Sequence, residues 1–261
     1  FLRRLVAGVL LLNLFVFALA GLSLRQGYRQ YQERAEITTQ NLALALESEI
    51  GGNIATVNLA LSAVMDEHQE QQDASAIDGK ALNAYIERVR SRLPEIDALR
   101  ITNADGVLVY GTGVAPGSRV SLADRPHFMR LRDDPKAELA ISAPQISRVN
   151  GKWVIVLARR IDRPNGAFGG MVFAAISLEH LSKTFSALNV GAHGIVTLRS
   201  TDMGIIVRHP EPQGIGSVIG QQAAPTPLRE MVQAGRKAGT YQALSTVDGI
   251  GRTFSYRQVN V

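Results

Sequence analysis

The chain has 261 residues and contains no cysteine. Disulfide bonds and thiolate metal sites are therefore excluded, and an exported domain of this sequence must depend on its apolar core for stability. Apolar residues make up 46% of the chain, which is enough to supply such a core. The length leaves room for one or two domains.

The chain also has no large excess of positive or negative side chains. Lys and Arg number 28 against 23 Asp and Glu, and three of the arginines stand at positions 3, 4 and 25. Residues 26–261 therefore keep 25 basic against 23 acidic side chains. No stripe of Lys and Arg concentrates this small excess, so we expect no nucleic-acid partner.

Motifs of catalysis and metal binding are absent from the sequence. There is no G-x-S-x-G, phosphate-loop or H-E-x-x-H pattern. The histidines lack the spacing of metal ligands; they are His68, His127, His180, His193 and His209. We therefore expect no enzymatic activity in this chain, no metal and no cofactor.

One long apolar run lies near the N-terminus. It covers residues 5–24, with Asn13 and Ser23 as its polar interruptions. Twenty helical residues span roughly 30 Å, the thickness of the hydrocarbon core of a bilayer. The two arginines before the run favour a cytoplasmic N-terminus and export of the residues on the C-terminal side of the run. The sequence therefore predicts a transmembrane anchor over residues 1–24.

A cleaved signal peptide is the alternative interpretation of this run. Ala18-Leu19-Ala20 offers a small-residue cleavage pattern, although the run is longer than the usual apolar region of a signal peptide. Both interpretations export residues 26–261. The chain begins with Phe1 rather than Met and ends within a strand pattern, so we expect a piece of a longer polypeptide.

Proline is absent from residues 25–72, and a regular apolar stripe runs through them. Its members are three or four positions apart, which predicts one long helix over residues 25–75. They are Leu42, Leu46, Ile50, Ile54, Val57, Leu61 and Val64. Packing within the domain explains the stripe, and packing against a second copy, in a homodimer, is a secondary hypothesis.

Strand patterns replace the helical one after Pro94. Asn150-Gly151 is typical of a tight hairpin turn, because both turn residues must tolerate positive φ. Ser177 is a suitable N-cap for a helix after the last of these strands. The predicted strands are 99–102, 107–110, 141–149, 152–161 and 168–177, and the predicted helix is 178–188.

The same order of elements returns in the rest of the chain. Asp105 and Asp202 are 97 residues apart, and Asn150-Gly151 and Asp248-Gly249 are 98 apart. The near-constant offset predicts an α+β fold with two tandem modules, each an antiparallel sheet with helices on one side. The modules are 76–190 and a shorter, truncated 191–261, with expected strands at 195–200, 205–208 and 253–259 and a helix at 228–234.

Five segments resemble the double Cache (dCache, PAS-like) sensor region of bacterial transmembrane receptors. They are Ser121–Phe128, Ile141–Pro144, Gly151–Ile155, Ala158–Ile161 and Phe168–Val172. Their sequences are most similar to sensors attached to GGDEF diguanylate cyclases, and histidine kinases and chemoreceptors use related ones. The resemblance implies an inner-membrane receptor with residues 26–261 in the periplasm, which binds a small molecule and signals to a cytoplasmic output domain. A freely secreted solute-binding protein is a further alternative.

In this family the ligand binds in the membrane-distal module. The amino-acid-binding branch has an arginine, then a Trp-Tyr pair two residues later, and an aspartate that holds the ligand's amine. Arg125 occupies the arginine position, His127 and Phe128 replace the aromatic pair, and Ala175 stands where the aspartate would fall. An unpaired buried amine is costly. We therefore expect an anionic ligand, such as a carboxylate, held by Arg125 and His127.

Three further residues are candidates for contact with the ligand: Tyr110, Trp153 and Arg159. Packing is the alternative role for the aromatic candidates and for His127, and an ion pair within a loop is the alternative for Arg125. Arg159 and Arg160 are neighbours on one predicted strand, so one of them faces inward and the other faces away.

Overall fold

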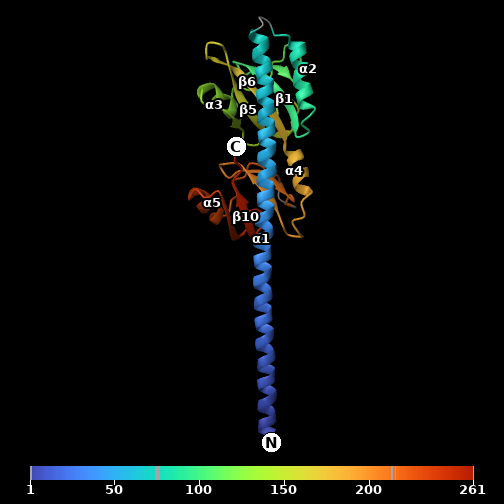
Figure 1. Cartoon of the computed structure of the whole chain (residues 1–261), viewed down its shortest axis with the longest axis vertical. Coiled ribbons are helices and arrows are strands. Elements are labelled where there is room, and N and C mark those ends of the chain that lie inside the picture. Colours follow the sequence, from blue (N-terminus) through green and yellow to red (C-terminus); the bar gives the residue numbers. More distant parts are fainter. Residues whose placement is uncertain (1, 74–76, 213, 215, 261) are drawn as a thin grey trace. The chain divides into compact units, whose positions relative to one another are not determined.

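The computed structural model describes residues 2–73, 77–212, 214 and 216–260, without the side chains of residues 4–7, 9 and 73. The fold is a mixture of helices and antiparallel sheets that follows a long N-terminal helix in the chain, as the sequence predicts (Figure 1). The chain divides into two compact units. The first contains residues up to 49, 225–245 and 249–260, and the second contains 50–224 and 246–248.

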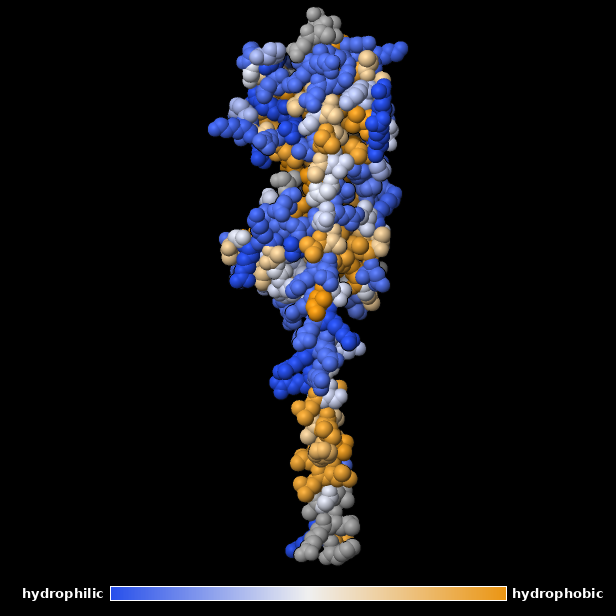
Figure 2. Space-filling view, viewed as in Figure 1, coloured by the Kyte–Doolittle hydropathy of each residue, from blue (hydrophilic) through white to orange (hydrophobic). Residues whose placement is uncertain are grey.

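Helix α1 runs without a break from Leu2 to Asp73. Within the described residues it is long enough and apolar enough to cross a membrane, and none of its apolar window is buried. Figure 2 shows these apolar side chains gathered around the N-terminal part of the helix. A signal sequence has the same properties, so the helix is compatible with both interpretations of the apolar run.

In the first unit, α1 packs against a β-hairpin. The hairpin is formed by β9 (Ala238–Leu244) and β10 (Gly251–Arg257), preceded by α5 (Thr226–Gln233). The hydroxyl groups of Thr39 and Ser255 are 2.8 Å apart, and Gln40 donates to Thr240 at 3.0 Å. Strand β9 is not predicted by the sequence pattern, because its Ala, Gly and Gln residues carry little strand preference.

The main sheet lies in the second unit and is antiparallel throughout. Its strand order is β2-β1-β6-β5-β3, and β4 also pairs with β5. The strands are β1 (Ile96–Asn103), β2 (Leu108–Gly111), β3 (Ala140–Ile141), β4 (Gln145–Ile146), β5 (Trp153–Asp162) and β6 (Phe168–Ser177). The other elements of this unit are α2 (Gly79–Arg90), α3 (Pro126–Asp133), α4 (Leu178–Ser186), β7 (Val196–Arg199) and β8 (Ile205–His209).

Helices cover both faces of this sheet, which corrects the prediction of helices on one side. Arg159 of β5 donates to Asn58 of α1 at 2.9 Å, whereas its neighbour Arg160 donates to the Leu131 carbonyl of α3 at 2.7 Å. Consecutive residues in the middle of β5 and β6 are apolar and buried. Both faces therefore need an apolar cover, and one layer of helices cannot supply it.

The predicted strand over residues 141–149 is wrong. Two short strands, β3 and β4, stand in its place, and Pro144 lies between them. Proline has no backbone N–H to donate to a neighbouring strand, so the pairing with β5 is interrupted there. The predicted turn is present as a wider loop, in which the Gly151 amide donates to the Ser147 carbonyl at 2.9 Å.

Strand β6 approaches β1 very closely at Gly170. This glycine has φ +138°, and a β-carbon placed on it would lie 2.0 Å from the Thr102 carbonyl oxygen. Only glycine fits both the backbone conformation and the space. The close approach lies where β1 ends, opposite Asn103.

Strands β7 and β8 repeat the hairpin arrangement of β1 and β2, as the sequence offset predicts. Both pairs are antiparallel and both contain a register irregularity. Arg208 of β8 pairs with Asp248 at 2.5 Å, and its side chain is almost completely buried. This ion pair attaches residues 246–248 to the β7–β8 hairpin.

Candidate ligand-binding site

A small cavity lies on the face of the main sheet that α3 covers. Its volume is about 30 Å³, which is room for roughly two water molecules. Apolar side chains form much of its wall: Leu108, Leu122, Val154, Val156, Phe173 and Ala175. Three nitrogen-rich side chains complete it, namely Arg100, Arg125 and His127, and residues 145–149 close its mouth. No carboxylate is among these lining residues.

Arg125 stands immediately before α3, in extended backbone conformation, with Pro126 at the start of the helix. Its Nη2 donates to the Ile146 carbonyl of the mouth segment at 3.0 Å. Its Nε is buried and has no hydrogen-bond partner. Burial, and then the nearby Arg148, lower the pKa of Arg125, while Asp124 raises it. The guanidinium therefore has an unused donor next to the cavity.

His127 lies on the buried face of α3 and is only 4% exposed. Neither of its ring nitrogens has a hydrogen-bond partner. Burial, and then the charge of Arg125, lower its pKa to about 4. The imidazole is therefore neutral near pH 7, with one donor and one acceptor unused.

The mouth segment, residues 145–149, is fastened to the loop before α3. Arg148 donates through Nη1 and Nη2 to the two carboxylate oxygens of Asp124, at 2.7 and 2.6 Å. The same Nη1 donates to the Ser121 carbonyl at 2.6 Å. The hydrogen bonds from Arg148 lower the pKa of Asp124 to about 2. The pair of Arg148 and Asp124 therefore joins residues 145–149 to the loop that precedes α3.

Arg100 is a cavity residue that the sequence analysis missed. It belongs to β1 and is 4% exposed. Its Nε donates to the Thr112 carbonyl at 2.7 Å, and burial lowers its pKa while Asp97 raises it. A signal was present in the sequence, because a lone Arg interrupts the apolar run around Leu99 and Ile101.

The structure places two of the predicted aromatic residues outside this cavity. Phe128 is 1% exposed and belongs to the core, where its ring meets Phe168 edge-on at 5.3 Å. Trp153 is 38% exposed at the beginning of β5 and lines a different hollow of about 620 Å³. Neither side chain lines the space beside Arg125 and His127.

Tyr110 and Arg159 lie on the opposite face of the sheet. Tyr110 pairs with Ile101 across β1 and β2, and its ring lies 6.3 Å from that of His68 on α1. Arg159 donates to Asn58 of the same helix. The structure therefore brings Arg125 and His127 together at the cavity and separates the other four candidates from it.

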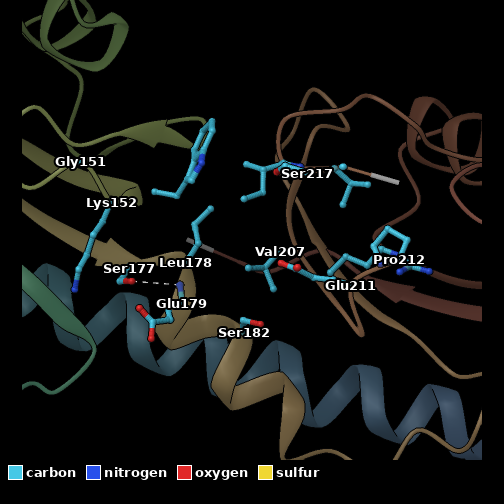
Figure 3. Close-up of a pocket in the computed structure, with 15 residues that line it drawn as sticks. Gly151, Lys152, Ser177, Leu178, Glu179, Ser182, Val207, Glu211, Pro212 and Ser217 are labelled. Carbon is cyan, nitrogen blue, oxygen red and sulfur yellow. Dashed lines mark hydrogen bonds between the residues drawn. The ribbon is translucent and has the colours of Figure 1, made fainter. Parts of the chain in front are cut away.

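The larger hollow carries both signs of charge. Lys152, Glu179 and Glu211 are among its lining residues, together with Leu178 and Val207 (Figure 3). Glu179 is already paired with Lys183 at 3.1 Å. This mixture selects no single class of ligand, in contrast to the smaller cavity. Among the described residues, no group of three or more His, Asp or Glu side chains could hold a metal ion.

Comparisons with known proteins agree with this architecture. Residues 179–261 match the model of a family described as dCache_1-like, histidine kinase sensor domain. No match was found among curated protein sequences. The extracellular domain of the putative histidine kinase rpHK1S-Z16 has 24% identity and a TM-score of 0.77, with 88% of this chain and 91% of that chain covered.

Two ligand-binding domains, one of them from the chemoreceptor CtaA, are also similar. The ligand-binding domain of Pseudomonas fluorescens CtaA, in complex with L-isoleucine, has 17% identity and a TM-score of 0.60, with 86% of each chain covered. The ligand-binding domain of Mlp24, with asparagine, has 14% identity and a TM-score of 0.61, with 86% of this chain and 87% of that chain covered. The chain therefore has the dCache-like fold of extracellular sensor domains. Such domains are not catalytic, in agreement with the expectation that this chain is not an enzyme.

Proposed function

We propose that this chain is the extracytoplasmic ligand-sensing region of a membrane-bound bacterial signal-transduction receptor. Residues 1–24 anchor it in the inner membrane, and residues 26–261 lie in the periplasm as two modules, 76–190 and 191–261. The dCache-like fold and the apolar N-terminal part of α1 support this proposal. A small molecule binds in the cavity beside Arg125 and His127.

The proposal rests mainly on the side-chain nitrogens of Arg125 and His127 that have no hydrogen-bond partner. Three buried nitrogens on two residues beside one cavity have no hydrogen-bond partner. A buried unsatisfied donor or acceptor costs about 1–3 kcal/mol, so such atoms are rarely left together without a reason. A bound ligand that supplies hydrogen bonds removes this cost.

The chemistry of the lining favours an anionic ligand. CtaA and Mlp24 bind amino acids, according to their descriptions. In this chain Ala175 lines the cavity where a carboxylate partner for an amine is expected, and the lining residues include no Asp or Glu. Arg125 and Arg100 instead provide positive charge, so a carboxylate fits better than an α-amino group.

A diguanylate cyclase is the leading proposal for the output domain, because of the resemblance of the sequence segments. A histidine kinase output is the second candidate, and the similarity to histidine kinase sensor domains favours it. In either case a ligand changes the output only when it binds one conformation better than the other. We propose that two copies associate through α1 in a homodimer.

Ligand binding can be tested with the whole chain in lipid nanodiscs. Thermal unfolding is followed while organic anions, amino acids and polyamines are added one at a time. We expect an anion to raise the Tm of the native chain and to lose this effect in Arg125→Gln. Arg130→Gln removes the same charge from an exposed position on α3 and should respond like the native chain.

Two outcomes would contradict the proposal. One is a response to cations but not to anions, and the other is an unchanged response in Arg125→Gln. Membrane topology needs its own measurement: alkaline phosphatase fused after residue 260 should be active in bacterial cells. N-terminal sequencing of the mature protein separates an anchor from a cleaved signal peptide.

A further inference from the structure

The cavity has a second cationic residue, Arg100, at a position separate from Arg125. Arg100 reaches it from β1 in the sheet, whereas Arg125 reaches it from the start of α3. The two guanidinium groups also have different electrostatic surroundings. Asp97 is the charge that acts on Arg100, and Arg148 and Asp124 are the charges that act on Arg125.

The buried guanidinium of Arg100 has no carboxylate of the described residues in contact with it, and the charge of Asp97 acts on it from a longer distance. Its side chain is almost completely buried, and among the residues that the structure describes no carboxylate lies within 4.0 Å of its nitrogens. Its one described hydrogen bond, to the Thr112 carbonyl, uses Nε only. A buried charge costs least when it is directly paired, and a carboxylate at a distance compensates it less than an anion in contact does.

We propose that Arg100 is a second anion-binding residue of this cavity, and that the ligand is an organic dianion. One anionic group is bound by Arg100, and the other is bound by Arg125 with His127. Leu108, Val156 and Phe173 line the space with apolar surface, which suits a short carbon chain between the two groups. This inference rests on the proposed function, because it requires the same cavity to be the ligand site.

The size of the cavity adds a condition. About 30 Å³ does not hold a dianion with a carbon chain, so the mouth segment must move outward when the ligand binds. This segment is held by the pairing of β4 with β5 and by the exposed ion pair of Arg148 with Asp124. The ion pair breaks at low cost because water replaces it, and the movement also requires the two-residue strand β4 to separate from β5.

Matched pairs of acids test the proposal. Malonate, succinate and glutarate are compared with propionate, butyrate and pentanoate by calorimetric titration of the whole chain in nanodiscs at low salt. We expect one dicarboxylate to bind at least about tenfold more tightly than its monocarboxylate partner, as a buried charge pair provides. Arg100→Gln should abolish this preference and leave monocarboxylate binding nearly unchanged.

Two further variants control for charge and for folding. Arg100→Lys keeps the positive charge without the two-pronged geometry and should retain part of the preference. Arg130→Gln should retain all of it. The Tm of the ligand-free chain separates a binding role from a structural one: if Arg100 serves the ligand, Arg100→Gln unfolds at the native temperature or above it.

The outcomes also separate this inference from the proposed function. A native chain that binds monocarboxylates through Arg125, with no gain from a second carboxylate, overturns the role of Arg100 alone. A dicarboxylate preference that survives Arg100→Gln does the same, as does a marked fall in the Tm of that variant without ligand. Absence of anion binding to the native chain overturns the anionic ligand of the proposed function as well.

Discussion

Arg148 donates two parallel hydrogen bonds, from Nη1 and Nη2, to the carboxylate oxygens of Asp124, at 2.7 and 2.6 Å. The pair joins the mouth segment of the cavity to the loop that carries Arg125. Both side chains are partly exposed, 38% for Arg148 and 65% for Asp124, so water screens their attraction. The pair therefore sets the position of the segment and contributes little to the stability of the fold.

Asp124→Asn should loosen the end of the mouth segment that carries Arg148, without unfolding the protein. Trp153 is the only tryptophan in the chain and is paired with Ile146 of the segment, so its fluorescence reports the change. The pKa of Asp124 is about 2, below its ordinary 3.8. In the native chain the pair is therefore complete above about pH 4 and is lost as the pH falls toward 2. Identical acid titrations of Trp153 emission in native and Asp124→Asn protein would contradict this role.

His127 should make the fold sensitive to mild acid. Its pKa is about 4 in the folded chain and 6.5 ordinarily, so the unfolded chain takes up the proton first as the pH falls. Stability is therefore lost between about pH 6.5 and 4, by up to roughly 3 kcal/mol. Thermal unfolding of His127→Gln should show a weaker pH dependence over this range than the native chain. His180→Gln, on α4, is the comparison; an equal effect of both substitutions would refute the assignment.

Phe128 should act through packing rather than through the ligand. Its ring is 1% exposed and meets Phe168 in the core beneath α3. Phe128→Ala removes this contact and should lower the free energy of unfolding by about 3–5 kcal/mol. Phe128→Leu keeps most of the volume and should bind the ligand with native affinity. A large loss of affinity in Phe128→Leu at native stability would instead make Phe128 a ligand contact.

Gly170 should not tolerate any side chain. A β-carbon there would collide with the Thr102 carbonyl at 2.0 Å, so Gly170→Ala must separate β6 from β1. We expect a loss of several kcal/mol or failure to fold. Gly166→Ala is the control, because that glycine has φ +77° but no atom within 4 Å of the added carbon. It should cost about 1–2 kcal/mol, the penalty of the left-handed conformation alone. Similar unfolding curves for the two variants would disprove the collision.

Local patterns were enough to predict most of the elements. The proline-free stretch and its apolar stripe predicted the helix that ends at Asp73, and Ser177 caps α4 as expected, by accepting from the Glu179 amide at 3.2 Å. The prediction of one strand over 141–149 is wrong because Pro144 has no backbone N–H, so the pairing with β5 is interrupted between β3 and β4. Strand β9 was missed because its small and polar residues gain their strand conformation from pairing with β10.

The residues of the cavity could be predicted only in part. Alternation along a strand shows which side chains share a face of the sheet, but not which helix covers that face. Arg159 and Arg160 were expected on opposite faces, and they are, but the sequence could not decide which of them meets α3. The choice depends on the order of strands in the sheet and on the helix that covers each side. Arg100 could not be predicted for the same reason, because its side chain reaches the cavity through the position of β1 beside β6 in the sheet.

The adjacent attachments of Arg159 and Arg160 have a mechanical consequence. Arg160 holds the end of α3 through the Leu131 and Arg132 carbonyls, and Arg159 holds Asn58 of α1 from the next position along β5. The two hydrogen-bonding residues are consecutive on one strand, so β5 links α3 to α1 without an intervening loop. In the proposed receptor, a displacement of α3 by the ligand would therefore reach α1 through two consecutive residues of one strand.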